Sequence, residues 1–75
     1  MNIETVAENL RKTISGKEKF LKEVKQAVLN TQGTSHHVAA TTARFLEINV
    51  DELKRILQDV EQCLSDKVNN ASAGQ

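Results

Sequence analysis

Apolar residues recur at steps of three and four along the first thirty residues, a spacing that places them on one face of a helix. The stripe runs from Ile3 to Val28, and Asn2 precedes it as a suitable N-cap. Gly16 leaves two interpretations open: one helix weakened there by roughly 1 kcal/mol relative to alanine, or two collinear helices. Because the apolar phase continues across Gly16, we expect one helix from about Ile3 to Asn30.

The next segment, NTQGTS around Gly33, clusters turn-forming residues and predicts a loop. A second helix is expected from about residue 35 to Glu47, with Val38, Thr42, Phe45 and Leu46 buried. A third is expected from about Val50 to Val68, with an apolar stripe along most of its length. The small polar residues 69–75 are expected to form a disordered tail after a single helical domain, residues 1–68.

The join between the second and third helices has the spacing of a helix-turn-helix, in which two helices meet at a steep angle through a short turn. Asn49 and Glu52 fit the N-cap and N3 positions of a capping box, so a helix is expected to begin there. The side chains expected to fill one buried corner at this turn are Ala43, Leu46, Ile48, Leu53 and Ile56.

The stretch from about residue 38 to residue 57 resembles the Fis-type helix-turn-helix. The residues that match its pattern of small, apolar and capping positions are Thr42, Ala43, Leu46, Glu47, Ile48, Asn49 and Leu53. Two of them depart from the family: Glu47 stands where glycine is usual, and Thr42 replaces the first of two alanines. A left-handed backbone at Glu47 would cost about 1 kcal/mol or more. The resemblance implies insertion of the helix beginning at Asn49 into the major groove of DNA.

On that geometry, the outward-facing polar residues are candidates for DNA contacts. They are Thr41, Arg44, Asn49, Lys54, Arg55 and Gln58. The competing interpretation is that they form the solvated face of an ordinary helical hairpin, with pairs four residues apart such as Asp51 and Arg55.

A chain of 75 residues with two phenylalanines, no tryptophan and no tyrosine must build a small aliphatic core. Small helical proteins often complete such a core by pairing, so we expect a dimer or a place in a larger complex. The apolar positions assigned to that dimer or partner interface are Ile3, Leu10, Leu21, Val24, Val28, Leu57, Val60 and Leu64.

The charge and chemistry of the chain narrow the classes of function. Ten basic and ten acidic residues give a net charge of zero, which argues against strong sequence-independent binding of nucleic acid. The lone Cys63 and the adjacent His36 and His37 make no recognisable metal site, and we expect no cofactor, no small-molecule substrate and no enzymatic activity. The lack of a long apolar run or secretory signal favours a location away from membranes, cytoplasmic or, in a eukaryote, nuclear.

The predicted protein is therefore all-α: a long amphipathic helix, then a helix-turn-helix whose last helix is extended, in a small dimeric bundle. The favoured function is a dimeric DNA-binding protein, regulatory or architectural. The alternative is a non-enzymatic adaptor or assembly subunit that binds partner proteins through its amphipathic helices.

Overall fold

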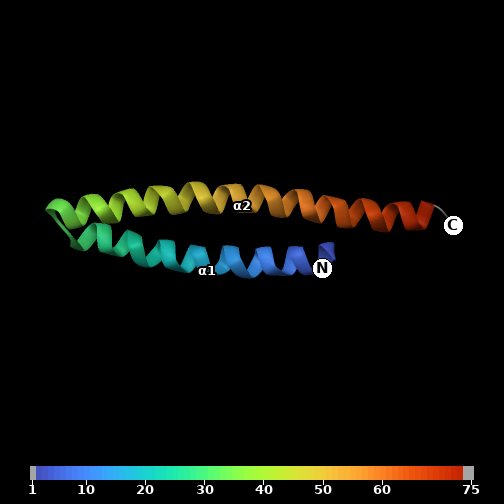
Figure 1. Cartoon of the computed structure of the whole chain (residues 1–75), viewed down its shortest axis with the longest axis horizontal. Coiled ribbons are helices and arrows are strands. Elements are labelled where there is room, and N and C mark those ends of the chain that lie inside the picture. Colours follow the sequence, from blue (N-terminus) through green and yellow to red (C-terminus); the bar gives the residue numbers. More distant parts are fainter. Residues whose placement is uncertain (1, 74–75) are drawn as a thin grey trace.

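Two antiparallel helices and a short loop make up the described part of the chain (Figure 1). The computed structural model describes the backbone of residues 2–73 and the side chains of residues 2–66. Helix α1 is Ile3–Asn30 and helix α2 is Gly33–Ala73. The all-α class is confirmed, in the form of a helical hairpin. The tail predicted for residues 69–75 lies outside the described side chains.

Helix α1 begins and ends as the sequence predicts, and it is continuous across Gly16. The Asn2 side chain is the N-cap: its Oδ1 accepts from the Thr5 backbone N–H at 2.8 Å, satisfying a donor that the first turn leaves without a helical partner. At the other end Thr31 has extended backbone angles, and its hydroxyl donates to the Ala27 carbonyl at 2.6 Å. Side-chain hydrogen bonds therefore close both ends of α1.

The turn of the hairpin depends on Gly33 and His36. Gly33 has a φ of 65°, a left-handed conformation that glycine adopts without steric cost. Three residues later, His36 Nδ1 lies 3.0 Å from the Val28 carbonyl oxygen. Because a carbonyl only accepts, the ring donates, and this bond links the first turn of α2 to the last turn of α1. The predicted loop around Gly33 is confirmed, although it is limited to Thr31 and Gln32.

The predicted turn between two helices at Glu47 to Asn49 is absent, because α2 passes through these residues as regular helix. No non-glycine residue of the described chain has a positive φ, and no glycine or proline lies between Thr34 and Ala73. A turn here would break backbone hydrogen bonds, and it would require a left-handed backbone at Glu47, which a glutamate does not adopt without a steric cost. The helix-turn-helix geometry was therefore a wrong prediction, and Asn49 lies within a helix instead of capping one.

The hydrophobic core is a single seam between the two helices, along which apolar side chains alternate at steps of four and three, as in a coiled coil. On α1 the seam comprises Ile3, Ala7, Leu10, Ile14, Lys17, Leu21, Val24 and Val28. On α2 it comprises Ala39, Ala43, Leu46, Val50, Leu53, Leu57, Val60 and Leu64. The buried members are Ala7, Ile14, Ala43, Leu46, Val50 and Val60, and the others are half-buried.

The predicted buried corner does not form, because its five residues fall on different faces of α2. Ala43, Leu46 and Leu53 lie in the seam. Ile48 and Ile56 are 56% and 48% exposed. Val38 and Phe45, also predicted to be buried, are 58% and 68% exposed. A two-helix hairpin covers only one stripe of each helix, so the remaining apolar residues stay in contact with solvent.

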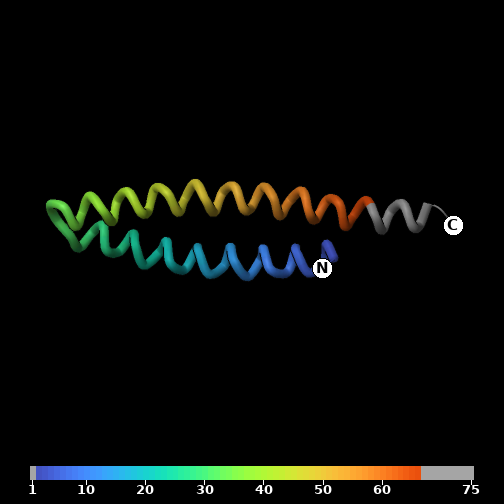
Figure 2. Tube along the Cα trace, viewed as in Figure 1, coloured from blue at the N-terminus to red at the C-terminus, as the bar shows by residue number. Residues whose placement is uncertain are grey.

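The hairpin is a rod of 64 × 17 × 15 Å. The two helices lie side by side over nearly the full length of α1 (Figure 2). Its Cα radius of gyration is 17.6 Å, whereas a compact domain of this length has one of about 11 Å. The chain therefore exposes far more of its side-chain surface than a globular domain does.

Candidate protein-docking surface

One side of the hairpin is closed by ion pairs. The residues that directly follow seam positions on α1 include Arg11, Glu18 and Lys25, and the antiparallel course of α2 brings Glu61, Lys54 and Glu47 beside them. The Arg11–Glu61, Lys54–Glu18 and Lys25–Glu47 pairs have N···O distances of 3.0, 3.0 and 2.8 Å. We call this side the charged flank.

The three pairs repeat with the period of the seam. Each step of seven residues along α1 is matched by a step of seven back along α2, so one register satisfies all three. Each side chain is about half exposed, and such a pair contributes only about 0.2–1 kcal/mol. Their main effect is on register, because a shift of α2 by one heptad would place like charges opposite each other at Glu18.

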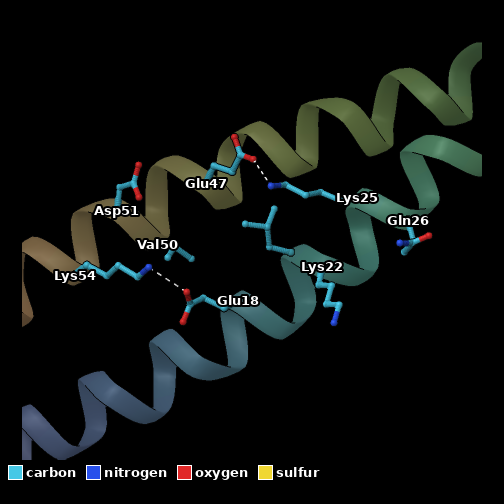
Figure 3. A pocket seen from close by; sticks show the side chains of 9 residues that line it. Glu18, Lys22, Lys25, Gln26, Glu47, Val50, Asp51 and Lys54 are labelled. Atoms are coloured by element: carbon cyan, nitrogen blue, oxygen red, sulfur yellow. Dashed lines mark ion pairs between the residues drawn. The ribbon is translucent and has the colours of Figure 1, made fainter.

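The groove on the charged flank is polar and open (Figure 3). It has a volume of about 540 Å³ and its lining includes Glu18, Lys25, Glu47 and Lys54, which are the members of two ion pairs. Val50 lies at its floor, while Lys22 and Asp51 lie at its rims. Ligand pockets are mostly apolar and enclose their ligand, so this groove does not have the character of a small-molecule site.

The opposite side of the hairpin has no charge at its equivalent positions. These residues directly precede every second seam position, and the helical rotation of about 100° per residue places them on the other side from the ion pairs. We call them the uncharged flank: Val6, Thr13, Phe20 and Ala27 on α1, with Thr42, Asn49, Ile56 and Cys63 on α2. The residues that precede the remaining seam positions lie further out on this side and include Glu23, Glu52 and Asp59. A groove near the turn, lined by both Ala27 and Thr42, confirms that the two helices share this side.

Large apolar side chains on the uncharged flank remain in contact with solvent. Phe20 is 49% exposed and Ile56 is 48% exposed. Val38 and Phe45 lie further out on the same side of α2, and Val38 lines the groove with Ala27. Aromatic and aliphatic residues that can be buried together are the usual anchors of protein interfaces. This flank is therefore the surface best suited to dock another helix.

Asn49 lies in the middle of the uncharged flank. Its side chain is partly buried, and its Oδ1 is buried without a hydrogen-bond donor among the described residues. An unsatisfied buried acceptor costs roughly 1–3 kcal/mol. Asn49 is thus an energetic weak point of the isolated hairpin.

The residues predicted to contact DNA do not converge on one end of a helix. They lie along α2 from Thr41 to Gln58, a distance of about 25 Å at 1.5 Å per residue. Lys54 is paired with Glu18, and Asn49 is turned toward the uncharged flank. Thr41, Arg44, Arg55 and Gln58 are exposed on other parts of the helix surface.

The residues predicted to form a dimer or partner interface lie in the seam within one chain. Three of them share a groove with a seam residue of α2. Leu21 lies beside Val50, Val24 beside Ala39, and Val28 beside Ala43. Ile3, Leu10, Leu57, Val60 and Leu64 occupy the same stripes. The exposed residues of the uncharged flank were not identified from the sequence as a docking surface. Periodicity alone assigns an apolar residue next to a seam position to the same broad apolar stripe as the seam.

Three other features of the described residues bear on function: possible metal ligands, reactive thiols and the apolar character of the helices. No three His, Cys, Asp or Glu side chains among them lie close enough to hold a metal ion. Cys63 is a free, exposed thiol. In the part of the chain that the structure describes, neither helix combines the length and apolar character that crossing a membrane requires.

Comparison with protein-family models, with curated proteins and with solved structures gives no match for this chain. The functional argument therefore depends on the geometry of the hairpin.

Proposed function

We propose that the protein is a non-enzymatic helical adaptor or assembly subunit that docks helices of a protein partner through its uncharged flank. The observation that carries the proposal is the asymmetry between the two sides of the hairpin. Three interhelical ion pairs occupy one flank, whereas the other presents uncharged residues with Phe20 and Ile56 about half exposed.

The energetics favour docking on this side. Charged residues are depleted from the cores of protein interfaces because they lose hydration on association, while aromatic residues are enriched there. Full burial of a phenylalanine or isoleucine side chain contributes about 1.5–3 kcal/mol. Phe20, Phe45 and Ile56 together therefore offer enough apolar surface to hold a partner, and the charged flank would remain in water.

DNA binding has less support. It was predicted from a turn at Glu47 to Asn49, which α2 does not contain. Four basic and six acidic residues give α2 a net charge of −2, and a surface of this sign repels phosphate. In a fluorescence titration with duplex DNA at low and moderate salt, we expect no binding at either concentration. Binding that weakens steeply with salt would instead support the DNA-binding hypothesis.

A cytoplasmic or nuclear location is part of the proposal. Its support is the single Cys63, since a chain with one cysteine cannot close an internal disulfide and suits a reducing compartment.

Site-specific photo-crosslinking in the native cell tests the proposal. A benzoylphenylalanine is placed at Phe20 or Phe45 on the uncharged flank. The matched control is Leu29, which is 78% exposed and lines a groove with Lys25 and Glu47 of the charged flank. We expect protein adducts from Phe20 and Phe45 and not from Leu29. Equal labelling from all three positions, or no protein adduct from the uncharged flank, would overturn the assignment.

A further inference from the structure

We propose that the partner on the uncharged flank is a second copy of this chain, and that the two hairpins pair side by side with their turns at the same end. This inference rests on the docking role of that flank and names its occupant. The product is a four-helix bundle with a twofold axis parallel to the rod, in which α1 of each copy packs against α2 of the other.

The exposed surface of the chain is large enough for such an interface. The solvent-accessible area is 5758 Å² for a chain of 8.3 kDa, whereas a compact monomer of this mass exposes about 4,600 Å². The excess of roughly 1,200 Å² exceeds the approximately 800 Å² that each partner buries in an interface of standard size. A second hairpin can therefore restore the surface-to-volume ratio of an ordinary domain.

The charges of the two helices are complementary, which identifies the second copy as the occupant. Helix α1 has six basic and four acidic residues, a net charge of +2, and α2 has four basic and six acidic residues, a net charge of −2. Without the three ion pairs of the charged flank, the net charges are +1 and −1. A copy of the same chain thus offers an acidic helix to the basic one and a basic helix to the acidic one. Complementary potentials of this kind favour the correct arrangement and disfavour others.

The same charges select one of the two twofold arrangements that bring uncharged flanks face to face. With the turns at the same end, each α1 lies against the second copy's α2. With the turns at opposite ends, each helix lies against its own counterpart, so that acidic α2 meets acidic α2. Like-charge contacts of this kind are costly, which favours the same-end arrangement.

Outer-face residues beside the uncharged flank agree with this choice, with Glu23 of α1 as the acidic exception on the basic helix. The ion-pair register puts Lys12 of α1 near the level of Asp59 of α2, and Lys19 near the level of Glu52. All four are exposed. A twofold axis parallel to the rod leaves the height of each residue along the rod unchanged. In the same-end arrangement each lysine therefore lies at the height of an acidic residue of the other copy. The opposite arrangement brings the two copies of Glu52 toward each other.

Light scattering coupled to gel filtration on the full chain tests the stoichiometry. We expect twice the mass of 8.3 kDa at about 100 µM protein, a dimer for Leu29→Asp, and monomers for Phe20→Asp and Ile56→Asp. Circular dichroism must show that both monomeric variants keep their helicity. Phe20→Ala, which adds no charge, should weaken association about tenfold or more, since a truncated anchor costs over 1 kcal/mol. A monomeric wild type overturns the second copy as occupant.

Distance measurement between spin labels tests the arrangement. In a Cys63→Ser background, Gln32→Cys places one nitroxide on the exposed loop of each copy. The same-end dimer brings the two labels within the width of a four-helix bundle, about 20–30 Å, since each helix is about 10–12 Å wide. The opposite arrangement separates them by the length of α1, over about 40 Å at 1.5 Å per residue, and that result would overturn the proposal.

Charge reversal adds an independent check. Glu52→Lys should weaken the dimer about three- to tenfold, and the double variant Lys19→Glu with Glu52→Lys should restore it, as exposed pairs contribute up to about 1 kcal/mol. Failure of the second substitution to restore affinity would exclude the arrangement. A monomeric wild type whose position 20 still crosslinks to a protein of different mass would support the docking role of the uncharged flank. The same result would exclude a second copy of this chain as the occupant.

Discussion

Lys17 is the charged member of the hydrophobic seam. It stands between Ile14 and Leu21 in the alternation of four and three, and it is half-buried. Its aliphatic stem can pack against α2 while the amine reaches water. A leucine would bury more apolar surface, so Lys17→Leu should raise the free energy of unfolding by about 1 kcal/mol. Urea denaturation followed by circular dichroism measures this. Lys22→Leu, at an exposed position on the rim of the charged flank, is the matched control and should have little effect.

Asn49 presents the opposite situation, a polar group where an apolar one would fit. Its Oδ1 is buried without a donor among the described residues, so Asn49→Leu should stabilise the isolated hairpin by about 1–3 kcal/mol. Thermal unfolding at a protein concentration below the association range isolates this effect from dimerisation. A lower melting temperature for Asn49→Leu would show that the amide makes a favourable interaction in the hairpin.

At the level of the element, the continuity of α2 is open to a direct test at Glu47. In a continuous helix, Glu47→Gly should cost about 1 kcal/mol from lost helix propensity, and it also removes the 2.8 Å ion pair with Lys25. A left-handed turn at this position would instead be relieved by glycine. Chemical denaturation therefore distinguishes the two backbones by the sign of the change. Glu47→Gln is the control, since it removes the charge and keeps a good helix former.

The ends of α1 were predictable from sequence because they depend on local chemistry. Asn2 is a standard N-cap residue, and Gly33 meets the need for a positive φ at the turn. The course of α2 was not predictable in the same way. Ala43, Leu46 and Leu53 suit the corner of a helix-turn-helix, but they also suit a continuous seam from Ala39 to Leu64. The distinguishing signals were the glutamate at position 47 and the absence of glycine and proline between Thr34 and Ala73.

The uncharged flank was harder to predict because periodicity shows which side chains share a stripe but not how wide the covering element is. Phe20 and Phe45 belong to broad apolar stripes, and a third helix would have buried them. In a two-helix hairpin only the seam is covered, which leaves Phe20 and Phe45 49% and 68% exposed. The number of packed helices, a property of the whole fold, decides whether such residues form core or surface.

At the scale of the whole molecule, the rod shape determines how association changes the dimensions of the particle. Side-by-side pairing doubles the mass but adds only to the thickness, so small-angle scattering should give a maximum dimension for the dimer close to the 64 Å of one hairpin. The two short extents of 17 and 15 Å should increase toward those of a four-helix bundle. End-to-end association would instead nearly double the maximum dimension at the same mass, because the helices would share only their tips. The Phe20→Asp variant, measured at the same concentration, provides the scattering curve of the single rod. A dimer much longer than this reference would place the contact at the ends of the hairpin and remove the uncharged flank from the interface.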